Sequence, residues 1–254
     1  MAIPLYLAMT AAEFSGCEKM PEKIAWMACH FSSYGTSLSN LPRTLPEGSL
    51  LILNDRTPVH GHDKLGIADD LARAVDALGC CGLLLDFQRP ECEETAAIVK
   101  ALLALPCPVC VSECYAKELD CPVFLPPVPP HVPIKEYLAP WSGREIWLEA
   151  ALEGEELTLT ESGCQISAPG KPIDSPEHRD AALFCHYRIA VEERCARFSL
   201  YRSRDDLTAL LDAAQDLGVT RTVGLWQELH WQESCCPDTR LSNADASINC
   251  CLSY

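Results

Sequence analysis

The chain has 254 residues, with 20 Lys and Arg against 36 Asp and Glu, and a formal net charge of −16. This acidic balance argues against nucleic acid and membrane surfaces as partners, because both attract basic patches. Hydrophobic residues make up 48% of the chain, which excludes a disordered protein, and no apolar run reaches the roughly 18–20 residues that span a bilayer. A chain of this length fits one large α/β domain better than two ordinary ones.

The N-terminal segment lacks the pattern of a secretory signal. Residues 3–9 are apolar, but the first basic residue is Lys19, so no positive charge precedes the apolar run. We expect a buried first strand here and a cytoplasmic protein. In that compartment the 16 cysteines are expected to stay reduced. We expect no cofactor.

Apolar runs of strand length recur along the chain. They are residues 3–9, 24–29, 49–54, 81–86, 108–112, 122–125, 144–149 and 221–226. Apolar residues at helical spacing predict helices over residues 65–78, 93–105 and 205–217. Alternating strands and helices form parallel βαβ units, and near-continuously apolar strands are covered on both faces. The pattern therefore predicts an α/β fold, a (β/α)8 TIM barrel. The alternative is an open doubly wound sheet, but no Gly-rich phosphate loop marks its first turn.

The pattern changes between the seventh and eighth predicted strands. Short segments rich in β-formers occupy residues 157–160, 164–166, 184–191 and 197–201. We predict a β-rich insertion at about residues 152–201 within a barrel domain of residues 1–231. Residues 232–254 are polar and lack a helical period, and we expect them to form a C-terminal tail.

Residues 79–88 (GCCGLLLDFQ) cover the fourth predicted strand and its end. They resemble the fourth-strand motif G-F-D-G-x-D-x-D-x-E of family-18 glycoside hydrolases, the chitinases and their relatives. Gly79 and Gly82 match the glycines, and Asp86 matches the last Asp. Two departures matter: the first two Asp residues of the motif are absent, and Gln88 stands where the family has its catalytic Glu.

The closing part of the chain also resembles this family. Residues 198–207 lead through a Tyr- and Asp-containing loop into a helix, and residues 217–226 lead into the eighth predicted strand, which ends in Trp226. In the family that Trp is the floor of the sugar subsite. The third strand departs from the family pattern, because Asn54, Asp55 and Arg56 replace its Ser-x-Gly-Gly end. The Met-x-Tyr-Asp of the sixth strand is absent as well.

The resemblance implies a carbohydrate-binding barrel with altered chemistry. In the family the Glu protonates the leaving oxygen, and the preceding Asp holds the substrate acetamide that acts as nucleophile. A glutamine cannot deliver a proton at neutral pH, so we expect binding of a carbohydrate or related small ligand without ordinary chitinase activity. Asp86, Gln88 and Trp226 would line the pocket, with Asp55 and Arg56 at its rim.

Other carboxylates at predicted strand ends leave an alternative open. Glu113 follows the fifth strand, Glu149 ends the seventh, and Glu228 follows the eighth. Barrel active sites lie at the carboxyl ends of the strands, so one of these could serve as a displaced acid in an active glycoside hydrolase. A third alternative is a non-catalytic interaction protein. The oligomeric state stays open.

Three further features near strand ends bear on ligand binding. Phe31 ends the second strand and could stack on a sugar face, and Arg89 could pair with Asp86 or hold an anionic ligand. His60, His62 and Asp63 could ligate a metal, but a polar loop whose Asp caps the next helix is the favoured interpretation. We expect no metal site.

Overall fold

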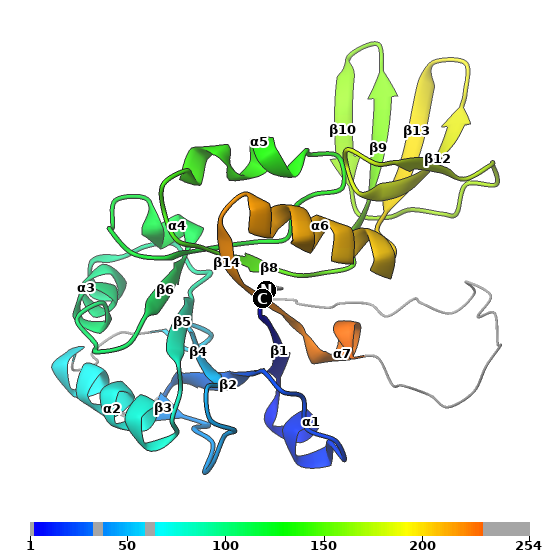
Figure 1. Cartoon of the computed structure of the whole chain (residues 1–254). Coiled ribbons are helices and arrows are strands. Elements are labelled where there is room, and N and C mark those ends of the chain that lie inside the picture. The colour runs from blue at the N-terminus through cyan, green and yellow to red at the C-terminus, as the bar shows by residue number, and fades with distance from the viewer. Residues whose placement is uncertain (1–2, 33–37, 59–63, 231–254) are drawn as a thin grey trace.

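The structure, a computed structural model, describes residues 3–32, 38–58 and 64–230 (Figure 1). Eight parallel strands form a closed barrel, because β1 pairs with both β2 and β14. These strands are β1 (Leu5–Met9), β2 (Ile24–Phe31), β4 (Leu50–Asn54), β5 (Gly82–Asp86), β6 (Val109–Ser112), β7 (Val123–Leu125), β8 (Ile146–Glu149) and β14 (Val219–Leu225). The short strand β3 (Leu38–Ser39) pairs antiparallel with β2. The predicted TIM barrel is confirmed.

Side chains from alternate strand positions fill the inside of the barrel. This cluster consists of Tyr6, Ala8, Ala25, Leu50, Ile52, Leu84, Cys110, Phe124, Trp147 and Val223. Trp147 is fully buried, and the guanidinium of Arg221 lies 4.6 Å from the centre of its ring. The interior is therefore a packed core, and a ligand site has to lie at a mouth of the barrel rather than within it.

Three long helices pack outside the barrel, and they match the three that the sequence predicts. They are α2 (Lys64–Ala77), α3 (Glu93–Leu102) and α6 (Arg204–Asp216). Ser203 caps α6 through a capping box with Asp206, and Gly218 just beyond the helix has a φ of 95° that suits glycine. The remaining helical segments are short: α1 (Ala11–Gly16), α4 (Glu113–Ala116), α5 (Ile134–Leu138), the 3-10 turn η1 (Ala139–Trp141) and α7 (Trp226–Leu229).

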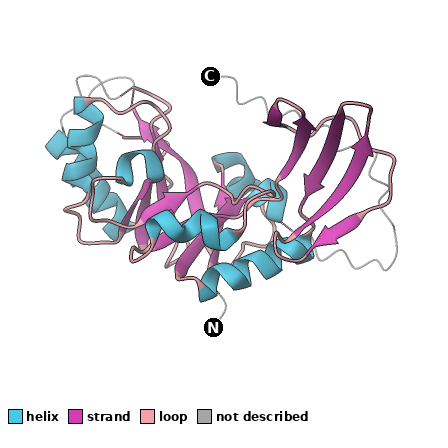
Figure 2. Ribbon diagram, turned by 90° about the horizontal axis from the view of Figure 1, so that it is seen from above, coloured by secondary structure: helices cyan, strands magenta, loops and turns pink. Residues whose placement is uncertain are grey.

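The predicted insertion between the last two barrel strands is confirmed. It is an antiparallel sheet of five strands in the order β10-β9-β13-β12-β11. The strands are β9 (Gly154–Thr160), β10 (Gly163–Ser167), β11 (His178–Asp180), β12 (Cys185–Val191) and β13 (Cys195–Tyr201). Figure 2 shows this sheet standing to one side of the barrel. The predicted domain boundaries stay a prediction.

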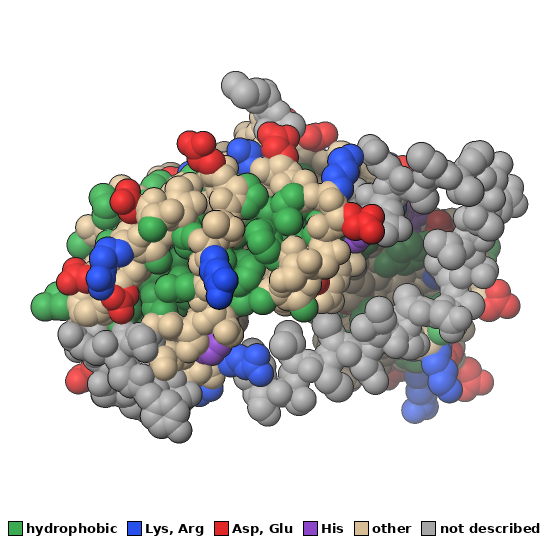
Figure 3. Space-filling view, turned by 90° about the horizontal axis from the view of Figure 1, so that it is seen from below, with side chains coloured by type: hydrophobic (Ala, Val, Ile, Leu, Met, Phe, Trp, Pro, Cys, Tyr) green, Lys and Arg blue, Asp and Glu red, His purple; other side chains and the backbone are tan. Residues whose placement is uncertain are grey.

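Among the described residues, no helix is long and apolar enough to cross a membrane. The cysteines of this part of the chain are all free thiols. Figure 3 shows hydrophobic side chains grouped on one face of the molecule, with charged side chains scattered among and around them. Apolar surface of this kind is ordinary for a folded protein.

Candidate active site at the barrel mouth

Asp86 and Gln88 lie together where β5 ends. Leu84 points into the barrel, so Asp86, two residues further along the strand, faces the same way at the mouth. The Gln88 side-chain amide donates a hydrogen bond of 2.6 Å to Asp86 Oδ1. Burial raises the pKa of Asp86, the hydrogen bond from Gln88 opposes that rise, and the charge of Asp55 adds to it. The two residues form a carboxylate–amide pair.

Asp55 holds the loops after β4 and β5 together. Its side chain is buried and accepts hydrogen bonds from the backbone N–H of Gln88 at 3.1 Å and of Arg89 at 2.8 Å. The Arg89 side chain donates in return to the carbonyls of Asp55 and Arg56, both at 2.8 Å. The guanidinium of Arg89 is thus occupied by main-chain oxygens, while Arg56 is exposed. These contacts shape the mouth by positioning the segment that carries Gln88.

Glu149 is the most perturbed carboxyl among the predicted site residues. It ends β8, and two strands, β7 and β6, lie between β8 and β5 in the barrel. Burial raises its pKa to about 7, and the charges of Asp86, Glu153 and Glu228 add to the rise. The carboxyl is therefore close to half protonated at neutral pH. Such a group can donate or accept a proton under physiological conditions.

Glu228 and Glu153 complete this carboxylate cluster. Glu228 lies in α7 and accepts a hydrogen bond from the backbone N–H of Leu152, so α7 is fastened to the chain leaving β8. Burial raises the pKa of Glu153, as does the charge of Glu228, while the buried Arg202 lowers it. Glu153 is not among the predicted site residues, although the acidic run after the seventh predicted strand is a signal for it.

Glu113 and Glu149 have a neighbour in common, the phenol of Tyr137. Glu113 begins α4, directly after β6. Tyr137 of α5 donates its hydroxyl to the Pro126 carbonyl at 2.9 Å. Burial raises the pKa of Tyr137, and the charges of Glu113 and Glu149 raise it further. Tyr137 therefore lies near both carboxyls, a position that no motif in the sequence indicates.

The two aromatic residues singled out by the sequence have different surroundings. Trp226 begins α7 and is half-buried, and its ring stacks on His230 with centroids 4.0 Å apart and planes 6° from parallel. Phe31 is fully buried and packs against Phe87, with ring centroids 5.7 Å apart. Trp226 belongs to the segment that follows the last barrel strand, whereas Phe31 is part of the core.

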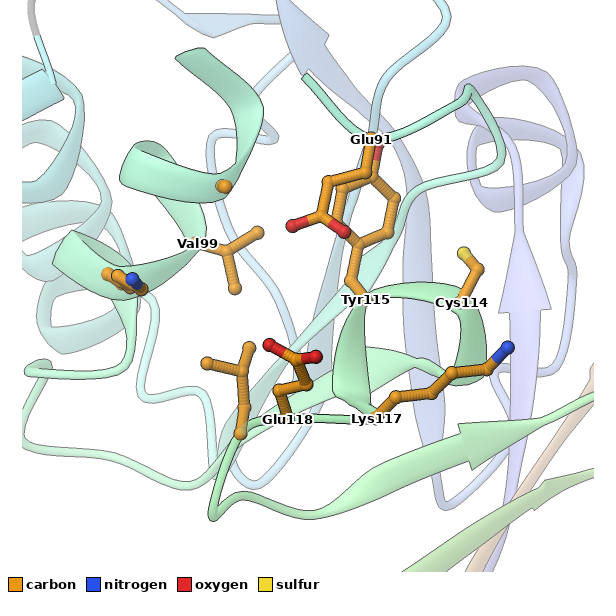
Figure 4. Close-up of a pocket in the computed structure, with 9 residues that line it drawn as sticks. Glu91, Val99, Cys114, Tyr115, Lys117 and Glu118 are labelled. Carbon is orange, nitrogen blue, oxygen red and sulfur yellow. The ribbon is translucent and has the colours of Figure 1, made fainter. Parts of the chain in front are cut away.

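A cavity of about 220 Å³ lies between α3 and α4. Figure 4 shows the carboxylates of Glu91 and Glu118 turned toward the space beside Val99, with the Lys117 amine pointing away. This cavity shares no lining residue with the carboxylate cluster of Asp86, Glu149, Glu153 and Glu228. Its charged rim residues are exposed to solvent.

Metal ligation finds no support in the described ranges. Within them, no group of three or more His, Cys, Asp or Glu side chains is arranged to hold a metal ion. His60, His62 and Asp63, the possible ligands noted in the sequence, lie outside the described residues.

No protein-family model and no curated protein matches the sequence. Solved structures match the fold. The spore cortex-lytic enzyme SleL of Bacillus cereus is 11% identical over 87% of this chain and 70% of that chain, with a TM-score of 0.53. A family-18 chitinase mutant from Cycas revoluta, in complex with (GlcNAc)4, is 12% identical over 88% of this chain and 94% of that chain, with a TM-score of 0.50.

The barrel shares its fold with these two structures, one of which is a family-18 chitinase. The resemblance first seen in residues 79–88 is therefore confirmed at the level of the fold. Identities this low say nothing about which side chains have kept their roles. The chemistry has to be argued from the residues at the mouth.

Proposed function

We propose that this chain is a carbohydrate-binding barrel whose ligand site is the mouth formed by Asp86, Gln88, Glu149, Glu228 and Trp226. The observation that carries the proposal is the Asp86–Gln88 pair at the carboxyl end of a barrel strand, where barrel enzymes have their sites. The (GlcNAc)4 complex of the similarly folded Cycas revoluta chitinase supports a glycan as the ligand.

The amide of Gln88 can hydrogen-bond to a ligand but cannot protonate a leaving group. It donates one hydrogen bond to Asp86 and retains a second N–H and a carbonyl oxygen for a ligand. It has no acidic proton to give to a leaving oxygen, and general acid catalysis is typically worth 10²–10⁴-fold in rate. The site therefore binds its glycan without the ordinary chitinase reaction.

The pKa of Glu149 favours a second candidate function. A carboxyl with a pKa of about 7 is well matched to acid–base work at neutral pH. Glu228 is engaged by the backbone N–H of Leu152. In this alternative, Glu149 donates the proton that Gln88 cannot, and the barrel is an active glycoside hydrolase.

A thermal-shift titration with N-acetylglucosamine oligomers and a wider panel of sugars tests the proposal. A ligand present at 100 times its Kd stabilises the fold by about 2.7 kcal/mol. We expect a saturable rise in Tm that disappears in Asp86→Ala and Trp226→Ala and persists in Asp69→Ala, an exposed position on α2. A flat response across the whole panel would overturn carbohydrate binding and favour an interaction protein.

Turnover of the ligand that binds separates the two candidates. If the barrel only binds, the bound oligomer is recovered intact after prolonged incubation. If Glu149 is the proton donor, the oligomer is cleaved, and Glu149→Gln abolishes cleavage while the thermal shift remains. Cleavage that survives in Glu149→Gln would rule out Glu149 as the acid.

A further inference from the structure

A row of polar side chains crosses one face of the insertion sheet. In the strand register Arg179 of β11 lies opposite His186 of β12, and His186 lies opposite Tyr201 of β13. Residues opposite each other on neighbouring strands share a face. The rings of His186 and Tyr201 stack with centroids 5.6 Å apart and planes 20° from parallel. The imidazole is thus held in a fixed orientation.

Asp206 of the barrel helix α6 meets this row. It is fully buried, and its two oxygens are shared among four donors from three residues, one of which is the backbone N–H of Ser203. Oδ1 is 2.9 Å from Arg179 Nε, and Oδ2 is 3.1 Å from His186 Nε2 and 2.6 Å from Ser203 Oγ. Burial would raise the pKa of Asp206, but the hydrogen bonds from Ser203 and Arg179 and the charge of His186 lower it overall. Asp206 is therefore ionised and accepts hydrogen bonds from both the insertion sheet and its own helix.

The other ring nitrogen of His186 also faces a carboxylate. Its Nδ1 is 3.2 Å from Oε1 of Glu177, the residue just before β11. The second oxygen of Glu177 accepts from the Tyr201 hydroxyl and lies 3.3 Å from Arg188 Nη2. The pKa of Glu177 is lowered, and the hydrogen bond from Tyr201 is the main cause. His186 therefore bridges two carboxylates that both stay ionised in mildly acidic solution.

We propose that His186 is a pH-sensitive tie that fastens the insertion sheet to α6. The doubly protonated imidazolium donates one N–H to Asp206 and one to Glu177. When it loses a proton to water, one ring nitrogen presents a lone pair to a carboxylate oxygen, and that contact becomes repulsive. The neighbouring guanidinium groups of Arg179 and Arg188 contact the same two carboxylates.

The strength of the tie depends on the proton of the imidazole. The tie is complete when both carboxylates are ionised and the imidazole carries a proton on each nitrogen. When His186 loses one of these protons, the attachment weakens. The insertion joins the chain between β8, which carries Glu149, and α6, so the tie governs how firmly the segment beside the barrel mouth is held.

Amide hydrogen exchange of the full chain at pH 5.5 and pH 8, corrected for the intrinsic pH dependence of exchange, tests the tie. We expect protection in β11, β12 and the first turn of α6 to fall by about tenfold from pH 5.5 to pH 8 in the native chain. His186→Gln keeps a polar side chain but cannot titrate, so its protection should not depend on pH. His178→Gln is the matched control, because His178 is exposed and stacks on Tyr187 away from Asp206.

Two results would overturn the proposal. One is equal protection of the native chain at both pH values. The other is a fall in His186→Gln as large as in the native chain. A nitrogen-15 spectrum of the native imidazoles gives a test that needs no variant: at pH 5.5 both His186 ring nitrogens should carry protons. A single protonated ring nitrogen at that pH would also contradict the tie.

Discussion

At the scale of single residues, the raised pKa of Glu149 has a consequence for stability. In the folded chain its carboxyl holds a proton up to about pH 7, whereas the ordinary value is 4.5. Between these two pH values the unfolded chain has released a proton that the native chain still binds. The free energy of unfolding therefore falls as the pH rises from about 4.5 to about 7.

Glu149→Gln removes this ionisation, so it should make the free energy of unfolding less dependent on pH. We expect the variant to be more stable than the native chain by on the order of 2 kcal/mol at pH 8, and equally stable at pH 4. Urea unfolding at the two pH values measures the difference. Glu136→Gln, at an exposed position of α5, should change neither value. A gap between variant and native chain that is the same at pH 4 and pH 8 would contradict the raised pKa.

At the scale of elements, Asp55 joins the loop after β4 to the loop after β5. Its removal leaves two backbone N–H groups without their acceptor. An unsatisfied buried donor costs about 1–3 kcal/mol. We expect Asp55→Ala to lower the free energy of unfolding by about 2–4 kcal/mol in urea titrations, and Asp55→Asn, which keeps one acceptor oxygen, to lower it less. Asp69→Ala, at an exposed site on α2, is the control.

The same variant distinguishes structural from ligand-binding roles. If Asp55 contacts the ligand at the rim, Asp55→Ala should abolish the thermal shift with sugars while its free energy of unfolding stays native. If Asp55 instead holds the two loops together, Asp55→Ala lowers the free energy of unfolding. Intact stability together with a lost thermal shift would therefore refute the loop-fastening role.

The elements show why some of the fold is predictable from sequence. Residues 24–29 and 49–54 predict β2 and β4 because strands covered on both faces must be apolar throughout. The helices α4 and α7 have four residues each, too few for a helical period to show. Pairings such as β2 with β3 depend on which segments meet in space, and no local pattern encodes them.

The candidate site divides in the same way. Asp86 and Glu149 are predictable because each ends an apolar strand, and the carboxyl ends of barrel strands meet at one mouth. Glu153 and Tyr137 come from connecting segments, and their approach to Glu149 depends on how those segments fold over the mouth. The use of Asp55 as an acceptor for backbone N–H groups is likewise a tertiary contact.

At the scale of the whole molecule, one buried arginine links the barrel mouth to the insertion. Arg202 follows β13, and its side chain donates to the carbonyls of Val128 and Pro129. Its backbone N–H donates to the Glu153 carbonyl at 3.0 Å. The end of the insertion, the proline-rich segment after β7 and the loop carrying Glu153 are thereby joined at one point. The mouth and the insertion form a continuous structure.

The barrel closes where its last strand, β14, packs against its first strand, β1. Gly224 of β14 lies opposite Leu7 of β1, where the final strand meets the first. A Cβ atom at Gly224 would lie 2.5 Å from the Ala150 carbonyl oxygen and closer still to the Leu229 side chain. The carbonyl belongs to the backbone just after β8, so it cannot move aside without shifting the strand. Gly224→Ala therefore forces β14 away from β8 or from α7.

We expect Gly224→Ala to lower the free energy of unfolding by about 2–3 kcal/mol, the usual cost of overpacking a closed core. Urea titration followed by circular dichroism measures the loss. An unchanged slope of the free energy of unfolding against urea concentration would show that the variant and the native chain expose the same surface area on unfolding. Gly16→Ala is the matched control, because nothing lies within 4 Å of a Cβ built there, and its midpoint should stay near the native value. If the two variants unfold at the same urea concentration, a Cβ atom fits at Gly224 without a clash. That result would contradict the close packing of β14 against Ala150 and Leu229.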